Sequence, residues 1–390
     1  MKPIFVRYTL VFTLLLLLIT NNSIAQNRGE QLDFYLITCD VGSDVASAYG
    51  HSAIRMIDRA AGTDETYNYG TYNFGEPNFL WKFLRGDLNY CLSVNPTRYF
   101  LGNYAYYERS VSQRQFILTN EQKEELATFL ERNALPENMY YLYDFVFDNC
   151  ATRIRDIFEK EGEFYFENKE LDLSFRENIA LYLEGRDWLK YGTDFLLASS
   201  MDKQMDRREE GFLPFKLESN LCEVQNLLTM KPLLGDRESL LIGNAIKKTP
   251  FYLTPLFLLT LLFVISLVLF FVYRKAYRVI YYIHCVALGL GGLFVAFMWF
   301  GTNHNCTPNN WNLLWVNPLF LLLLVLKKKS LARKIVQYEL LFCLCLALLF
   351  CLASLGGQCF LPQEINVAAI PTILLVLLSV LDTTLTNRAK

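Results

Sequence analysis

The last third of the chain is a succession of apolar runs, and this feature restricts the fold more than any other. About 20 apolar residues are needed for a helix to cross the hydrocarbon core of a bilayer. Five runs approach or reach that length: residues 252–273, 279–301, 312–326, 336–355 and 366–381, of which the third and fifth are short. The runs predict an all-α transmembrane domain of five helices over residues 251–390.

Charges in the connections between the runs predict the orientation of this domain. Three stretches are basic: RKAYR at 274–278, KKKSLARK at 327–334 and NRAK at 387–390. Two others carry neither Lys nor Arg: TNHNCTPNNWN at 302–312 and GGQCFLPQE at 356–364. Because basic loops stay in the cytoplasm, we expect a multi-pass protein of the inner (cytoplasmic) membrane with a cytoplasmic C-terminus.

The N-terminus has the features of an export signal peptide over residues 1–25. Lys2 and Arg7 give a basic start, residues 10–19 form a short apolar core, and residues 23–25 place small side chains at a cleavage site. The alternative is an uncleaved N-terminal anchor. With either, the part of the chain before the first apolar run is exported to the periplasm, in agreement with the loop charges.

The exported part divides into a globular domain, residues 26–205, and a charged, irregular juxtamembrane segment, residues 206–250. Hydrophobic residues make up 53% of the chain, above the usual range for soluble proteins, and the excess lies in the apolar runs. The net charge of −2 is close to neutral and gives no indication of a nucleic-acid partner.

Hydrophobic periodicity in residues 26–205 predicts strands followed by helices. Alternating apolar and polar residues predict strands at 32–40, 52–58, 66–74 and 113–119. Thr119 and Gln122 have the spacing of a capping box before an amphipathic helix at 120–133, and another helix begins near Cys150. This order indicates an α+β domain.

Cys150 and His51 are the residues in the exported domain best suited to chemistry. A thiolate is a strong nucleophile, and the N-terminus of a helix lowers the pKa of a cysteine. Asp148 or Asn149 would cap the helix at Cys150, and Arg153 follows within its first turn. His51 is the only histidine of the exported domain, so it is the candidate base there. Spacing alone leaves an alternative open, in which the cysteine is structural and the strand histidine is bonded to a tyrosine.

Several motifs resemble one known family, in the same order along the chain. They are YGHSAIRM at 49–56, YNYGTYNF at 67–74, PNFLWKFLRGDLNY at 77–90, YDFVFDNCATRIRDIF at 143–158 and NWNLLWVNPL at 310–319. These stretches resemble the Lnb family of membrane-bound lipoprotein N-acyltransferases. The order of histidine before cysteine is also similar to the permuted papain-like folds, which include the NlpC/P60 and lecithin:retinol-acyltransferase-like enzymes. The resemblance implies a permuted papain-like exported domain.

The resemblance also implies roles for individual residues. Cys150 matches the nucleophile, which carries an acyl group as a thioester, and His51 matches the base. The residue that orients the histidine would be Asn68 or Tyr69, although ordinary cross-strand packing also explains both. Asn149 and Arg153 would support the site.

The implied function is the transfer of an acyl chain from a membrane phospholipid to the α-amine of a lipoprotein N-terminal cysteine. The acceptor would be a diacylated or lyso lipoprotein, and the reaction needs no cofactor and no metal. One alternative is a membrane-anchored NlpC/P60-like cysteine peptidase or amidase acting on cell-wall peptides. Another is a non-enzymatic membrane protein, in which Cys150 would be held in a disulfide. His304, in an outer loop, is a rival to His51 as the base.

The remaining cysteines separate by compartment. Cys306 and Cys359 both fall in outer loops and form a candidate disulfide. Cys39, Cys91 and Cys222 lie in the exported part of the chain, and the sequence leaves their disulfide state open.

Overall fold

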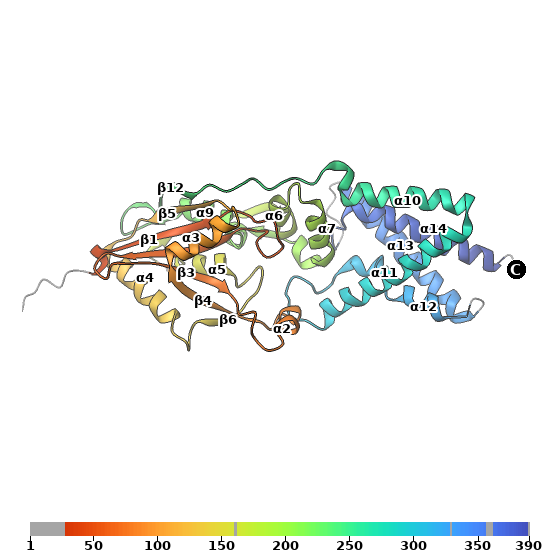
Figure 1. Cartoon of the computed structure of the whole chain (residues 1–390), viewed down its shortest axis with the longest axis horizontal. Helices are drawn as coiled ribbons and strands as arrows, with labels where there is room; N and C mark the ends of the chain where they lie inside the picture. The colour runs from red at the N-terminus through yellow and green to blue at the C-terminus, as the bar shows by residue number, and fades with distance from the viewer. Residues whose placement is uncertain (1–27, 160–161, 328–329, 356–361, 389–390) are drawn as a thin grey trace, which may run out of the picture.

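The computed structural model describes residues 28–159, 162–327, 330–355 and 362–388. They form two parts that lie end to end in an elongated molecule (Figure 1). The first, here called the N-terminal domain, is built on a β-sheet. The second, here called the membrane domain, is helical and begins near residue 251. The predicted signal peptide lies outside the described residues.

A seven-stranded antiparallel sheet organises the N-terminal domain, with the strand order β12-β5-β1-β2-β3-β4-β6. The strands are β1 (Leu32–Cys39), β2 (His51–Asp58), β3 (Thr63–Thr71), β4 (Asn89–Pro96), β5 (Val111–Phe116), β6 (Tyr140–Leu142) and β12 (Leu234–Leu241). The four strands predicted from alternation are therefore present, and the α+β class is confirmed.

Alternation along β1 directs its side chains into two separate cores. Phe34 and Leu36 point to the face that is covered by α4 (Asn120–Asn133), α5 (Cys150–Ile157) and α9 (Pro214–Glu223). Ile37 and Cys39 point to the other face, which is covered by α3 (Thr97–Tyr106). The predicted capping box is present at the start of α4, where Thr119 accepts a hydrogen bond from the Gln122 backbone N–H and the Gln122 side chain accepts one from Thr119.

Shorter elements complete the N-terminal domain. They are η1 (Arg28–Gln31), α2 (Phe79–Arg85), β7 (Phe164–Tyr165), β8 (Glu170–Ser174), α6 (Phe175–Tyr182), α7 (Asp187–Leu196), η2 (Ser199–Asp202), β9 (Gln204–Asp206), α8 (Arg207–Glu210), β10 (Gln225–Asn226) and β11 (Lys231–Pro232).

The sequence analysis expected the segment 206–250 to be irregular, but most of it has regular structure. It contains α9, which packs on the sheet, and β12, which forms an edge of the sheet by pairing with β5. Leu217 and Leu221 of α9 are buried in the main core. Residues 242–250 are the segment's longest stretch without helix or strand, and they run along the domain to the first membrane helix (Figure 1).

The membrane domain contains three long and two shorter apolar helical regions in the predicted order. The long helices α10 (Pro255–Val272), α11 (Arg274–Phe300) and α13 (Leu331–Leu355) are long and apolar enough to cross a bilayer. The shorter regions are η4 (Trp311–Leu314) with α12 (Leu319–Val325), and η5 (Val367–Ala369) with α14 (Ile370–Arg388); η3 (Phe251–Leu253) precedes α10.

Two details of the membrane domain differ from expectation. The third apolar run is not one helix, because Pro318 lacks a backbone N–H and its ring disfavours helical geometry at Asn317. The run therefore forms a 3₁₀ turn and a separate short helix. The basic stretch 274–278 is not a loop but the first turns of α11, which follows α10 after the single residue Tyr273.

The two domains contact each other through the loop of residues 301–310, between α11 and η4. The backbone N–H of Asn303 donates to the carbonyl of Arg85 at the end of α2, at 2.7 Å. The backbone N–H of Ala198 donates to the carbonyl of Cys306, at 2.8 Å. The side chain of Asn312 in η4 donates to the carbonyl of Asp194 in α7. These bonds fix the end of the N-terminal domain nearest the membrane helices.

Arg176 anchors this junction from within the N-terminal domain. Its guanidinium is buried, with 2% of the side chain exposed, and forms an ion pair with Asp202 at 2.7 Å and another with Asp194 at 3.6 Å. It also donates to the carbonyls of Leu197 and Ala198. Removing one member of a buried pair leaves an uncompensated charge.

We therefore expect Arg176→Ala to lower the free energy of unfolding by about 3–5 kcal/mol. The matched control is Arg208→Ala, which removes a solvent-exposed pair with Glu159 and should cost at most about 1 kcal/mol. The free energy of unfolding of each variant is measured by denaturant unfolding of the purified full chain in detergent, monitored by tryptophan fluorescence. Equal losses in the two variants would contradict this role of Arg176.

Candidate active site

The side chain of Asn149 fixes the beginning of α5 and therefore the position of Cys150. Its Oδ1 accepts hydrogen bonds from the backbone N–H groups of Ala151 and Thr152, at 2.8 and 3.0 Å. Its Nδ2 donates to the carbonyls of Phe145 and Phe212, at 2.7 and 3.0 Å. The Thr152 hydroxyl accepts from the backbone N–H of Asn149 and completes a capping box. Of the two caps that the sequence suggested, Asn149 is the one present.

Cys150 and His51 meet at the end of the sheet. His51 is the first residue of β2, and the pairing of β2 with β3 stops at Ile54 and Tyr67, before His51 is reached. The side chains of Cys150 and His51 line the same cavity and interact closely enough to shift the pKa of both groups. The pair predicted from the sequence is therefore brought together by the fold.

Gly70 lies directly beside this pair. Its backbone φ is +92°, which L-residues with side chains rarely adopt. A Cβ at this position would lie 3.7 Å from Cε1 of His51 and 3.8 Å from Cβ of Cys150. Glycine thus leaves the space between β3 and the pair free of a side chain.

Asn68 contacts His51, whereas Tyr69 does not share this contact. Oδ1 of Asn68 lies 2.6 Å from Nε2 of His51. Since a carbonyl oxygen can only accept a hydrogen bond, Nε2 carries the proton and Nδ1 is the ring nitrogen left for the thiol. Successive residues of a strand face opposite ways, and the Tyr69 side chain is buried in the core on the α5 side of the sheet.

Electrostatics favour the ionised form of the pair. Burial of the sulfur raises the pKa of Cys150. The charge of His51, its hydrogen bond and the backbone N–H groups of Ser52 and Ala151 lower this pKa by more than burial raises it. The net pKa of Cys150 is therefore below its ordinary value. Burial lowers the pKa of His51, but the thiolate and the hydrogen bonds to Cys150 and Asn68 raise it, with a net rise. Both shifts act in the direction of a thiolate beside an imidazolium.

Cys39 gives a contrast within the same site. It pairs directly with His51 across β1 and β2, yet it is fully buried, and this burial raises the pKa of its thiol to about 12. A neutral thiol is a poor nucleophile. Of the two sulfur atoms near His51, only that of Cys150 is prepared for reaction.

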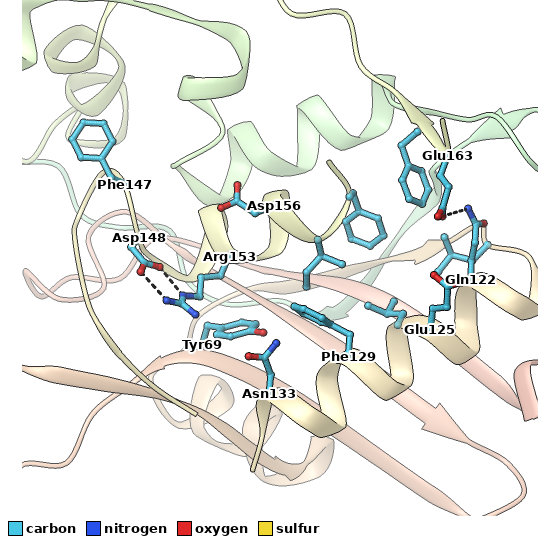
Figure 2. Close-up of a pocket in the computed structure, with 15 residues that line it drawn as sticks. Tyr69, Gln122, Glu125, Phe129, Asn133, Phe147, Asp148, Arg153, Asp156 and Glu163 are labelled. Atoms are coloured by element: carbon cyan, nitrogen blue, oxygen red, sulfur yellow. Dashed lines mark hydrogen bonds and ion pairs between the residues drawn. The ribbon is translucent and has the colours of Figure 1, made fainter. Parts of the chain in front are cut away.

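The contacts of Arg153 lie away from the thiol. Its guanidinium binds Asp148 through two hydrogen bonds of 2.6 and 2.7 Å and lies over the ring of Tyr141, 3.8 Å from its centroid. Figure 2 shows Arg153, Asp148 and Tyr69 lining a separate pocket of about 510 Å³ between α4 and α5. The expectation that Arg153 favours the thiolate therefore has no supporting contact, because its charge is compensated by Asp148.

An apolar cavity of about 580 Å³ opens beside the pair. Its lining includes His51, Asn149 and Cys150, together with aromatic and aliphatic residues of both walls: Val45, Tyr49, Tyr72, Phe74, Phe79, Leu80, Phe83, Leu88, Tyr90, Tyr143, Phe145, Phe212, Leu213 and Pro214. The sequence did not indicate this cavity, because its walls come from segments far apart in the chain.

His304 of the membrane domain also lines the apolar cavity. Its Nε2 bonds to the carbonyl of Leu84 in α2, at 3.1 Å. The residue considered as a rival base is therefore part of the same site. The pKa of the Cys150 thiol, however, is lowered by His51.

Cys150 carries a free thiol, as do Cys39, Cys91 and Cys222. The alternative that required Cys150 to be held in a disulfide is therefore wrong. Cys359 lies outside the described residues, so its disulfide with Cys306 stays a prediction.

The ionised pair predicts how Cys150 reacts with iodoacetamide. In the full chain, its alkylation should begin below the pH at which an ordinary cysteine reacts. His51→Ala removes the imidazole, the largest influence that lowers the pKa of Cys150, and leaves burial, which raises it. The midpoint should then move to higher pH, and the rate at pH 7 should fall by about tenfold or more.

Peptide mapping by mass spectrometry measures the alkylation of each cysteine separately. Cys91, whose pKa is raised by burial, is the internal control and should react equally in both proteins. An identical profile for Cys150 in the two proteins would show that His51 does not activate the thiol.

Comparison with known families gives two matches. Residues 20–177 match the Lnb N-terminal periplasmic domain, and residues 246–390 match the Lnb transmembrane domain. No curated protein and no solved structure matches the chain significantly. The N-terminal domain is thus a periplasmic domain joined to a transmembrane domain. With both domains present in order and covering most of its length, the chain belongs to the Lnb family.

Proposed function

We propose that this protein transfers an acyl chain from a membrane phospholipid, through a thioester on Cys150, to the α-amine of a lipoprotein N-terminal cysteine. The acceptor is a diacylated or lyso lipoprotein. The family name implies lipoprotein N-acylation. The observation that carries the proposal is the Cys150–His51–Asn68 arrangement opening on an apolar cavity that a membrane-domain residue helps to line.

In the first half of the reaction, Cys150 takes the acyl group. Nδ1 of His51 receives the thiol proton, and the sulfur attacks the ester carbonyl carbon of the phospholipid. The carbon–oxygen ester bond breaks, and the lysophospholipid leaves as an alcohol with the proton from His51. Asn68 holds the imidazole in the required orientation by accepting from Nε2.

In the second half, the α-amine of the acceptor attacks the thioester carbonyl. The carbon–sulfur bond breaks, an amide forms, and His51 takes the proton from the attacking nitrogen. That proton then returns to the sulfur of Cys150. The two halves make a ping-pong cycle with no net change in the protein.

The oxyanion that forms in each half needs a hydrogen-bond donor near the sulfur. Cys150 occupies the first position of α5, where backbone N–H groups have no acceptor within the helix. The N–H groups of Ala151 and Thr152 are already bound by Asn149. We therefore assign the backbone N–H of Cys150 as an oxyanion donor.

The membrane arrangement completes the proposal. The C-terminus is cytoplasmic, residues 1–25 are a signal peptide, and the site faces the outer leaflet of the inner membrane. Donor and acceptor are both anchored in lipid there. A cell-wall peptidase or amidase would need to bind extended polar peptides, and the mainly aromatic and aliphatic walls of the cavity do not favour such substrates.

The test is the mass of a lipoprotein N-terminal peptide from cells that carry Cys150→Ser or His51→Ala. Loss of the nucleophile or of its base should reduce N-acylation by about 10³-fold or more. Cys222→Ser, the same change in the same domain but away from the cavity, is the control and should retain it. Undiminished N-acylation in both active-site variants would refute the proposal, and loss of a peptide-cleaving activity instead would favour the hydrolase.

A further inference from the structure

One wall of the apolar cavity is a continuous file of aromatic rings that leads away from Cys150. Tyr143 stacks on Tyr90 with ring centroids 4.4 Å apart, and Tyr90 contacts Tyr72 at 5.1 Å. Tyr72 contacts Phe79 at 5.8 Å, and Phe79 stacks on Phe83 at 6.2 Å. The file therefore joins the catalytic end of the cavity to helix α2.

Helix α2 exposes its apolar side chains at the far end of this file. None of its seven residues is buried, and Leu80, Trp81 and Phe83 are 67%, 53% and 47% exposed. Phe74, which packs on Phe79 at 5.0 Å, is 72% exposed. A cluster of large exposed apolar residues marks a surface that contacts a partner or a membrane.

Contacts with the membrane domain indicate that this partner is lipid. Trp81 packs against Phe297, near the end of α11, with ring centroids 5.7 Å apart. α11 is long and apolar enough to cross a bilayer. The last turn of α2 is bonded to His304 and Asn303, which follow α11 directly. The exposed face of α2 thus lies at the level where a membrane helix ends.

We propose that the apolar cavity holds the fatty acyl chain of the Cys150 thioester and that the chain enters from the bilayer at α2. The inference rests on the proposed function, because it assumes a lipid donor. In this arrangement the ester carbonyl lies at Cys150 and the chain extends along the aromatic file. The length of the cavity then sets which chains are accepted.

Leu88 offers a direct test, because it lines the cavity and is only 3% exposed. Leu88→Phe adds volume inside the cavity. The matched control is Leu126→Phe, the same substitution at a residue that is 5% exposed and lines the separate pocket of Figure 2. The purified full chain is incubated without acceptor in vesicles that contain equal amounts of phospholipids with lauroyl, palmitoyl and stearoyl chains.

Intact-protein mass spectrometry then gives the proportion of each acyl group on Cys150. For Leu88→Phe, the ratio of stearoyl to lauroyl thioester should fall about tenfold or more relative to the unmodified chain. For Leu126→Phe, it should not change. An unchanged ratio in Leu88→Phe, with thioester still formed, would overturn the cavity assignment while leaving the proposed function intact. Absence of any thioester on the unmodified chain would instead refute the proposed function.

A second variant keeps the test decisive if Leu88→Phe does not fold. Phe83→Ala removes atoms from the cavity wall. Because Phe83 is already half-exposed, its removal should have little effect on the stability of the fold. In Phe83→Ala, the ratio of stearoyl to lauroyl thioester on Cys150 should rise instead of falling. The control is Phe129→Ala, which is 45% exposed and lines the pocket of Figure 2. An equal ratio of stearoyl to lauroyl thioester in Phe83→Ala and Phe129→Ala would contradict the proposal.

Discussion

The four hydrogen bonds of the Asn149 side chain are the interactions on which the site depends. Two of them cap the start of α5, and two tie Asn149 itself to the carbonyls of Phe145 and Phe212. Successive helical residues are rotated by about 100°. A start displaced by one residue would therefore turn the Cys150 sulfur away from His51. The helix start thus determines the chemistry, and the sheet only has to present the imidazole at the matching place.

The sheet presents that imidazole by ending its regular pairing early. β2 and β3 separate beyond Ile54 and Tyr67, and Gly70 takes a backbone conformation that side chains disfavour. In the gap, His51 reaches both Asn68 and Cys150. The membrane domain then contributes His304 to the cavity and holds α2 in place. The site is consequently a product of both domains.

Local signals in the sequence were sufficient for much of this arrangement. The capping box of α4 and the alternation in β1 depend on neighbours within a few residues, so they could be predicted. The His51–Cys150 pair was predictable because the exported domain has a single histidine. Asn68 was one of two candidates, and only the geometry of the strand distinguishes it from Tyr69. The supporting role expected of Arg153 stays a prediction, and the pairing of Arg153 with Asp148, five residues earlier, was not foreseen.

Features set by distant contacts were not predictable. The start of α2 follows no ordinary capping pattern, because Asn78 precedes the helix with φ of 58° and makes no side-chain cap. Strand β12 has polar residues in its central part, a pattern that is also typical of a linker. These residues are polar because β12 is an edge strand with much of its surface in solvent. Its partner β5 lies more than a hundred residues earlier in the chain.

That edge strand also determines what a soluble fragment of the protein must contain. A fragment that stops at residue 205 would leave the backbone groups of β5 without the partner that β12 supplies. Unpaired edges recruit strands from other molecules and promote aggregation. Secretion of the N-terminal domain on its own would therefore require a C-terminus beyond Leu241, close to the point near residue 251 where the hydrophobic part of the chain begins.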